Sequence, residues 1–354
     1  MSLTVLSVAY PFAPVSLDAV GGAEQVVATL DDALVAAGHR SIVLARADSD
    51  VRGLLVGVPT PRGEIDDAVR AATYGRYRQA IRRVLRERDV DVVHMHGIDF
   101  HAYLPPTGSP VLVTLHLPLN WYPPNALSAR PGVAFNCVSA AQRRTAAPNL
   151  QLLPDIENGV PDALFDIRLK KRRYALALGR ICPEKGFHLA LEAARGADIP
   201  LLVAGEVFPY AAHRAYFEEA IRPRLDSQRR FVGAVGFTRK RRLLAAAQCV
   251  VVPSLAPETA SLTAVEALAS GTPVVAFPSG ALADLIQHGR TGFLVGDVDE
   301  MAAAIVLAGT LRPEDCRAAV AHMRVARMTF GYVEQYHRLI HEMRSTLHGT
   351  LAVS

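Results

Sequence analysis

Two glutamates are placed where a carboxylate could act on a ligand. Glu258 lies in a predicted loop, and Glu266 is the only ionisable residue of the predicted helix 261–270. Glutamate is almost never buried without a partner, and helical side chains lean toward the N-terminus of their helix. We therefore predict that Glu266 directs its carboxylate toward the carboxyl edge of a sheet, near Glu258. A solvated edge of an amphipathic helix is the alternative.

The first turn of the same helix is a candidate anion site. The backbone N–H groups near Ser261 and Leu262 have no intrahelical acceptor and lie at the positive end of the helix dipole. They could hold a phosphate, whereas the Ser261 side chain could serve simply as the N-cap. These two interpretations are compatible.

A short loop carries two further cations. Arg180 and Lys185 belong to the segment 179–186, which follows a predicted strand and precedes a predicted helix. Only four of the 38 basic residues are lysines, so a lysine here suggests that a compact point charge is needed. The pair suits a diphosphate. The alternative is a surface loop in which Lys185 forms a salt bridge with Glu184.

Strand ends supply three more candidates of weaker specificity. Gly21 and Gly22 precede a predicted helix and allow close backbone approach to a ligand, although neither GxGxxG nor a Walker A sequence is present. His116 ends an apolar strand, and His94 and His96 end another. A histidine in such a position is more often structural than catalytic.

We expect no metal cofactor. The histidine pair has no carboxylate or cysteine at ligand spacing, and the Asp-x-Asp pairs at 89–91 and 297–299 are interpreted as structural. The cysteines are too far apart for the usual zinc patterns and are expected to be buried free thiols: Cys137, Cys182, Cys249 and Cys316.

The elements that must position these residues alternate between strand and helix. The strands are continuous apolar runs, which is typical of parallel sheets covered by helices on both faces. Ligands of such doubly wound α/β sheets bind at the carboxyl ends of the strands, so we predict two domains with a site between them. The predicted strands are 3–10, 41–45, 90–94, 111–115, 133–138, 174–178, 200–204, 231–235, 249–253 and 273–277.

Length and composition limit the remaining possibilities. A chain of 354 residues that is 50% hydrophobic can bury two cores. The net charge of +4 comes without an aromatic-interleaved basic stripe, so nucleic acid is not an expected partner. No run approaches the roughly 18 apolar residues of a membrane span, and the start does not resemble a signal peptide. We expect a cytoplasmic protein, and peripheral membrane contact through the basic helix 74–88 is possible but not favoured.

Taken together, these segments resemble the family-4 retaining glycosyltransferases of the GT-B fold, in which two Rossmann-like domains face an interdomain cleft. In the usual position of a Phe-Gly pair after the first glutamate, this chain has Thr259, Ala260 and Ser261, which leaves the identity of the donor sugar open. The matching segments are 21–24, His116, 157–160, 179–186, 231–235 and 258–275.

The resemblance implies roles for the donor-side residues. Arg180 and Lys185 would neutralise the donor diphosphate, which the N–H groups of Ser261 and Leu262 would also bind. Glu266 would hold the ribose hydroxyls and Glu258 the donor sugar. The base would lie against the loops after Ala204 and Gly233, with Val235 among its contacts.

The resemblance also implies a domain plan. Residues 1–160 would form the acceptor-side domain, in which Gly21 and Gly22 approach the diphosphate and His116 faces the sugar and the acceptor. Residues 161–330 would form the donor-side domain, and the helix 331–354 would return to the first domain. Trp121 could stack on the acceptor or anchor the core.

The resulting prediction is sugar transfer from a UDP- or GDP-linked donor to a hydroxyl of a small-molecule or glycan acceptor. Fixed cations and a helix N-terminus can stabilise the departing nucleoside diphosphate, so we predict a metal-independent reaction. Retention of configuration is implied by the resemblance alone. The alternatives are a GT-B-like nucleotide-sugar epimerase or hydrolase, and a non-catalytic nucleotide-sugar-binding protein.

Overall fold

The computed structural model describes residues 2–60, 63 and 65–351. The chain forms two compact units: unit 1 contains the chain up to Gly159 and from Val325 onward, and unit 2 contains Val160–Arg324. The limits expected from the sequence are residues 160 and 330. Within the described residues, no helix is both long and apolar enough to cross a membrane.

Unit 1 is built on a parallel sheet whose strand order is β3-β2-β1-β4-β5-β6. The four inner strands β2, β1, β4 and β5 are almost entirely buried, as a sheet covered on both faces requires. This order places the first strand in the middle and runs outward in both directions, which is the doubly wound arrangement. The strands are β1 (Thr4–Val8), β2 (Arg40–Arg46), β3 (Leu54–Val58), β4 (Val92–Met95), β5 (Val111–Leu115) and β6 (Val133–Cys137).

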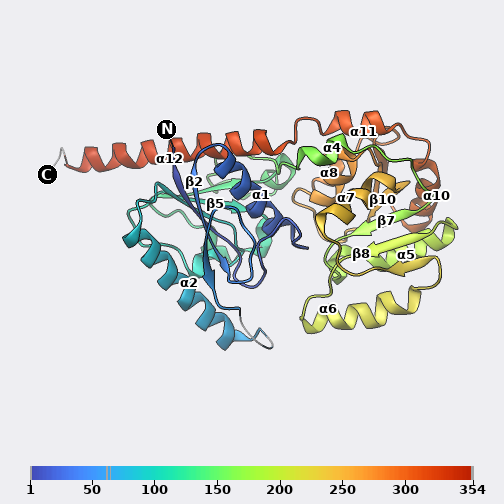
Figure 1. Ribbon diagram of the computed structural model, residues 1–354, viewed down its shortest axis with the longest axis horizontal. Coiled ribbons are helices and arrows are strands. Elements are labelled where there is room, and N and C mark those ends of the chain that lie inside the picture. Colours follow the sequence, from blue (N-terminus) through green and yellow to red (C-terminus); the bar gives the residue numbers. More distant parts are fainter. Residues whose placement is uncertain (1, 61–62, 64, 352–354) are drawn as a thin grey trace. The chain divides into compact units, whose positions relative to one another are not determined.

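Helices of unit 1 come from both ends of the chain. The C-terminal helix α12 (Val325–Leu351) packs against α1 (Gly22–Ala36) and β5, and is drawn in red in Figure 1. Its tyrosines Tyr332 and Tyr336 are fully buried. The other helices are α2 (Asp67–Glu87) and α3 (Ala140–Arg143), with short 3-10 turns at Phe100–Ala102, Leu119–Trp121 and Pro124–Leu127.

Unit 2 repeats this topology with its own parallel sheet, of order β12-β11-β10-β7-β8-β9. Its first strand, β7, again lies in the middle, so the chain reverses direction between β7 and β10. Such a switch point leaves room for a ligand beyond the carboxyl ends of the two strands. The strands are β7 (Ala175–Leu178), β8 (Leu201–Ala204), β9 (Arg229–Phe231), β10 (Cys249–Val252), β11 (Val274–Ala276) and β12 (Gly292–Leu294).

One helical segment of unit 2 is less regular than its sequence predicts. The sequence over 211–225 predicts a single helix, but the structure divides it into α6 (Ala211–Tyr216), a π-helical turn at Phe217–Ile221 and a 3-10 turn at Arg222–Arg224, where Pro223 interrupts the helical hydrogen bonding. The remaining helices are α4 (Asp162–Asp166), a 3-10 turn at Pro183–Lys185, α5 (Phe187–Gly196), α7 (Phe237–Ala246), α8 (Leu262–Ala269), α9 (Leu282–Leu285), α10 (Val298–Ala308) and α11 (Pro313–Ala319).

The sequence pattern does not predict the edge strands β3 and β12, because each contains a glycine. A Cβ on Gly57 would lie 3.0 Å from Cα of Ala47, and a Cβ on Gly292 would lie 1.9 Å from the carbonyl oxygen of Val274. Glycine is therefore needed for close approach to a neighbouring segment, although it weakens the strand signal. The predicted strand 231–235 is also displaced, since β9 ends at Phe231.

Candidate functional site

The loops that leave β7, β8 and β9 meet at the carboxyl edge of the unit 2 sheet. Gly205 donates its N–H to the carbonyl of Gly233, and Gly179 donates to Ala204. A Cβ on Gly205 would lie 1.8 Å from the carbonyl oxygen of Gly179, and Gly205 has a φ of +158°. The absence of a side chain there lets the first two loops lie in direct contact.

Lys185 is held at this edge by the glycine that follows it. Gly186 adopts a left-handed φ of +62°, and a Cβ there would lie 2.2 Å from the carbonyl oxygen of Pro253. The close approach to the end of β10 brings Nζ of Lys185 to 2.6 Å from Oε1 of Glu258. Lys185 therefore pairs with Glu258, and the alternative salt bridge between Lys185 and Glu184 is not observed.

The Glu258 carboxylate is nearly buried, with 10% of its side chain exposed, whereas 31% of the Lys185 side chain is exposed. Ser254 donates a hydrogen bond to the same carboxylate oxygen. Burial raises the pKa of Glu258, but the charges of Lys185 and Arg180 and these hydrogen bonds outweigh it and lower the pKa overall. Glu258 is therefore ionised and its backbone is fixed, since its carbonyl accepts from the N–H of Ala281 at 2.7 Å.

Arg180 contributes to the field at Glu258 without pairing with it. Its guanidinium lies over the Phe208 ring at 5.8 Å from the centroid. Its Nε is buried and has no hydrogen-bond partner in the part of the chain that the structure describes. The site thus holds two cations, Lys185 and Arg180, near the Glu258 and Glu184 carboxylates.

Glu266 has a partner that the sequence analysis missed. Its Oε1 lies 2.6 Å from Nζ of Lys240, and only 6% and 9% of the two side chains are exposed. Lys240 lies on the buried face of α7 together with Leu244. One signal was available in the sequence, because Lys240 is one of only four lysines and lies on an apolar helix face.

The start of α8 is strained rather than capped. Ser261 has φ and ψ of 48° and 70°, in the left-handed region, and its side chain makes no capping hydrogen bond. The alternative in which the Ser261 side chain caps the helix is therefore not observed. Ala264 and Val265 donate to the Ser261 carbonyl at 2.9 and 3.1 Å. The N–H groups of Ser261 and Leu262 precede this first turn and have no intrahelical acceptor.

In unit 1, His116 follows β5 and is 8% exposed. Its Nε2 lies 3.0 Å from Nδ1 of His96, and burial lowers the pKa of His116 to about 4. His116 is therefore neutral near pH 7. His94 is structural, because its two ring nitrogens bond the hydroxyls of Tyr336 and Thr114 at 2.7 Å each.

The other unit 1 candidates lie near strand ends. Gly21 is the N-cap of α1 with an ordinary extended φ of −80°. A Cβ on Gly21 would lie 1.8 Å from Oε2 of Glu24, so the buried Glu24 side chain occupies that space. Gly22 is exposed. Trp121 is 40% exposed, which excludes the interpretation that it anchors the core.

The Asp-x-Asp pairs are structural, as the sequence analysis predicts. Oδ2 of Asp91 accepts the N–H of Thr4 at 2.8 Å, and Oδ1 of Asp297 caps α10 by accepting the N–H of Glu300 at 2.8 Å. The four cysteines are buried and free.

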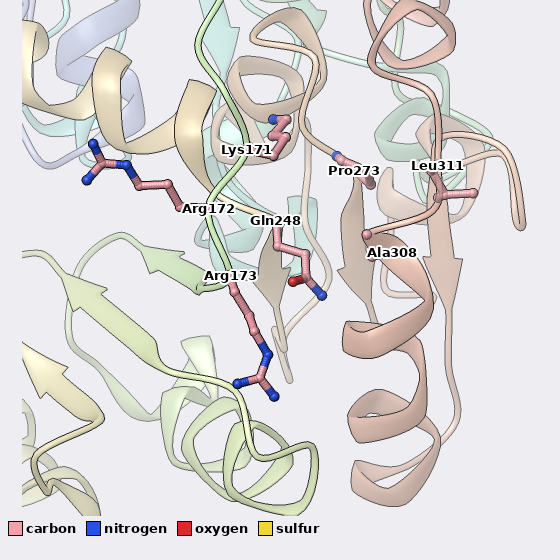
Figure 2. Close-up of a pocket in the computed structure, with 8 residues that line it drawn as sticks. Lys171, Arg172, Arg173, Gln248, Pro273, Ala308 and Leu311 are labelled. Carbon is pink, nitrogen blue, oxygen red and sulfur yellow. The ribbon is translucent and has the colours of Figure 1, made fainter.

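A cavity of about 240 Å³ lies at the opposite, amino edge of the unit 2 sheet (Figure 2). Lys171, Arg172 and Arg173 precede β7 and line it, together with Gln248 and Pro273. Their three positively charged groups point in different directions in Figure 2, so they do not converge on one ligand. None of the site residues predicted from the sequence lines this cavity.

Two family models match the chain. "Glycosyltransferase Family 4" matches residues 20–148, and "Glycosyl transferases group 1" matches residues 172–308. The chain belongs to glycosyltransferase family 4. It is similar to the phosphatidyl-myo-inositol mannosyltransferase of Mycolicibacterium smegmatis, with 28% identity over 90% of this chain and 89% of that protein. It is also similar to a D-inositol 3-phosphate glycosyltransferase of Corynebacterium urealyticum, with 34% identity over 41% of this chain and 36% of that protein.

Solved structures of this fold agree with that assignment. A glycosyltransferase involved in avilamycin A biosynthesis has a TM-score of 0.71 and 27% identity, with 96% of this chain and 98% of that chain covered. Anabaena HepE in complex with UDP-glucose has a TM-score of 0.70 and 18% identity, with 94% and 99% covered. The predicted GT-B fold and the predicted enzyme class are confirmed: this family-4 protein is a hexosyltransferase-type glycosyltransferase that uses a nucleotide sugar.

Proposed function

We propose that this enzyme transfers a hexose from a UDP- or GDP-linked donor to a hydroxyl of a small-molecule or glycan acceptor, with retention and without a metal ion in the transfer step. The observation that carries the proposal is the Lys185–Glu258 ion pair of 2.6 Å at the carboxyl edge of the unit 2 sheet. Arg180 lies close enough to help lower the pKa of Glu258.

The ion pair suggests how the donor binds. Lys185 is one-third exposed and its carboxylate partner is nearly buried, so an incoming anion reaches the ammonium from solvent. A diphosphate carries more negative charge than one carboxylate and can bind the Lys185 ammonium and the Arg180 guanidinium at the same time. Glu258 is then released from Lys185, and its carboxylate can accept a hydrogen bond from a hydroxyl group of the donor sugar.

The same groups suit the transfer step. Cleavage of the sugar–phosphate bond builds negative charge on the leaving diphosphate, and prepositioned donors stabilise such charge most strongly where it develops. Lys185, Arg180 and the N–H groups of Ser261 and Leu262 are the donors. Nζ of Lys240 lies 2.6 Å from Oε1 of Glu266 and holds that carboxylate in place. Glu266 is thereby positioned to accept hydrogen bonds from the ribose hydroxyls.

Acceptor recognition is assigned to unit 1. His116 is neutral, so its ring can form a hydrogen bond with an acceptor hydroxyl group but does not supply a positive charge. The Trp121 side chain, which is 40% exposed, offers an aromatic face. Because two relatives carry inositol in their names, the acceptor panel includes myo-inositol phosphates and phosphatidylinositol.

A thermal-shift panel tests donor binding. UDP, GDP, ADP, dTDP and CMP are each added with a chelator and with Mg²⁺, and a ligand at 100 times its Kd adds about 2.7 kcal/mol of stability. The proposal expects stabilisation by UDP or GDP with the chelator present. Stabilisation that requires Mg²⁺ overturns the metal-independent part, and no response to any nucleotide overturns the donor assignment.

An acceptor requirement separates transfer from the alternative reactions. With the preferred donor, the proposal expects sugar consumption to rise strongly when the acceptor panel is added. A nucleotide-sugar hydrolase or epimerase would consume donor at the same rate without acceptor, and a binding protein would not consume it.

A further inference from the structure

A separate group of metal-ligating side chains lies in unit 2. Sγ of Cys182, a carboxylate oxygen of Glu184 and a ring nitrogen of His213 all lie within 4.8 Å of one another. We propose that these three residues form a zinc-binding site. This site is distinct from the Lys185–Glu258 pair and does not depend on the proposed donor chemistry.

The two segments that supply the ligands are held by backbone hydrogen bonds. Cys182 and Glu184 lie in the loop after β7, where Cys182 accepts the N–H of Lys185 at 3.1 Å and Glu184 accepts the N–H of Leu255 at 2.8 Å. His213 lies in the first turn of α6 and donates its N–H to Tyr210 at 3.1 Å. The cluster is therefore part of the fold and does not rely on a chance contact between surface side chains.

The burial of the ligand atoms favours metal binding over solvation. Cys182 is only 2% exposed. Nδ1 of His213 is buried and has no hydrogen-bond partner among residues 2–60, 63 and 65–351. A buried ring nitrogen without a partner carries a desolvation cost that a metal ion would offset. Glu184 is exposed, so the cluster is open to ions from solvent.

The charges of the site are compatible with a divalent cation. The Arg180 guanidinium is a positive charge that acts on His213. The Cys182 thiol donates its proton to the carbonyl oxygen of Arg180, 3.6 Å away. On binding, the ion replaces that proton, which is released to solvent. One thiolate and one carboxylate then neutralise the ion, so repulsion from Arg180 is small.

The donor set identifies the class of metal. Sulfur, imidazole nitrogen and one carboxylate oxygen suit zinc and its neighbours and not magnesium or calcium, which prefer oxygen ligands. A tetrahedral zinc ion holds its ligand atoms about 3.3–3.7 Å apart. Because no two of the ligand atoms are more than 4.8 Å apart, each pair must close by at most about 1.5 Å to reach that geometry, and the fourth position stays open to water.

Cobalt titration of the full-length protein tests the site. A thiolate–cobalt charge-transfer band should appear and saturate near one equivalent, and added Zn²⁺ should remove it. We expect Cys182→Ser to abolish the band and His213→Gln to weaken binding by about 100-fold or more. His188→Gln is the matched control, because His188 bonds Tyr216 and lies outside the cluster.

The inference is overturned if no band forms with the reduced protein, or if the band survives in Cys182→Ser, which would place the metal on another cysteine. X-ray absorption of the zinc-loaded wild type provides a test that needs no variant. One sulfur and two or three nitrogen or oxygen neighbours are expected, and a shell without sulfur would contradict the site. These results do not depend on nucleotide binding, so they are distinguishable from failure of the proposed function.

Discussion

Two glutamate–lysine pairs with the same 2.6 Å separation differ in burial, and this difference separates their roles. The Lys185–Glu258 pair is partly open, with 31% of the Lys185 side chain exposed. The Lys240–Glu266 pair is nearly closed, with 9% and 6% exposed. A partly open pair can be exchanged for a ligand, whereas a buried pair fixes a carboxylate in place.

Removing the Lys185 ammonium should reduce turnover. Lys185→Ala is expected to lower kcat at saturating donor by about 10²–10³, because the leaving diphosphate loses a transition-state partner. Steady-state kinetics measures the effect, with the exposed Lys170→Ala as the control. An unchanged kcat in Lys185→Ala would exclude this role.

Breaking the buried pair should cost stability, and replacing both partners should restore it. Lys240→Met leaves Glu266 as an uncompensated buried charge and is expected to lower the free energy of unfolding by about 3–5 kcal/mol. The double variant Lys240→Met with Glu266→Met should recover most of that loss but bind nucleotide poorly. Urea unfolding and nucleotide titration measure the two effects. Additive losses of stability in the double variant would contradict the pairing.

The buried histidines should make unit 1 sensitive to acid. The folded pKa of His116 is about 4 against an ordinary value of 6.5, so folding favours the neutral ring. The neutral His116 ring makes its full contribution to the free energy of unfolding above pH 6.5. That contribution falls by about 3 kcal/mol in total as the pH drops to 4. His94 and His96 shift in the same direction. Denaturant unfolding between pH 7 and 4.5 should show a shallower loss in His116→Asn than in wild type, and equal slopes would count against this assignment.

At the scale of elements, the start of α8 shows that a serine before a helix does not always form the capping hydrogen bond that the sequence predicts. A serine before a helix predicts an N-cap, yet Ser261 adopts a left-handed backbone with no side-chain cap. The loop before α8 is also closely packed, since a Cβ on Gly280 would lie 2.2 Å from the Glu258 carbonyl oxygen. The usual capping preference of serine is therefore not realised at this helix start.

Ser261→Gly should therefore stabilise the protein. The left-handed backbone of a residue with a side chain lowers the free energy of unfolding by about 1–2 kcal/mol. Glycine removes this strain, but the greater backbone entropy that it gives the unfolded chain offsets part of the gain. The expected net gain is about 0.5–1 kcal/mol in thermal or urea unfolding. Gly186→Ala is the opposing comparison and should destabilise, because its Cβ would lie 2.2 Å from the Pro253 carbonyl oxygen. A loss of stability in Ser261→Gly would show that the hydroxyl contributes more than the strain costs.

The alternation of apolar strands and helices is enough to predict the fold, because parallel sheets leave an unmistakable pattern of buried strands. The edge strands escape prediction because Gly57 and Gly292 interrupt that pattern. Arg180, Lys185 and Glu258 follow predicted strands, and this is enough to predict that they lie at the carboxyl edge of the sheet. The partners of Glu258 and Glu266 lie 73 and 26 residues away, and no local spacing encodes such contacts.

At the scale of the whole molecule, each unit has the same doubly wound strand order, and the chain passes from one unit to the other at Gly159–Val160 and at Arg324–Val325. Helix α12 belongs to unit 1 because Tyr332 and Tyr336 are buried there and bond Thr114 and His94. The returning helix thereby completes the core of the first unit. Arg180, Lys185, Glu258 and Glu266 all lie in unit 2.

The central claim is that the donor diphosphate takes the place that Glu258 occupies on Lys185. Calorimetric titration of the preferred nucleoside diphosphate in the presence of a chelator tests it most directly, with wild type, Lys185→Ala and Glu258→Gln compared. The account predicts weaker binding to Lys185→Ala and tighter binding to Glu258→Gln, because the competing carboxylate has been removed. Unchanged affinity in Lys185→Ala, or weaker binding in Glu258→Gln, would contradict it.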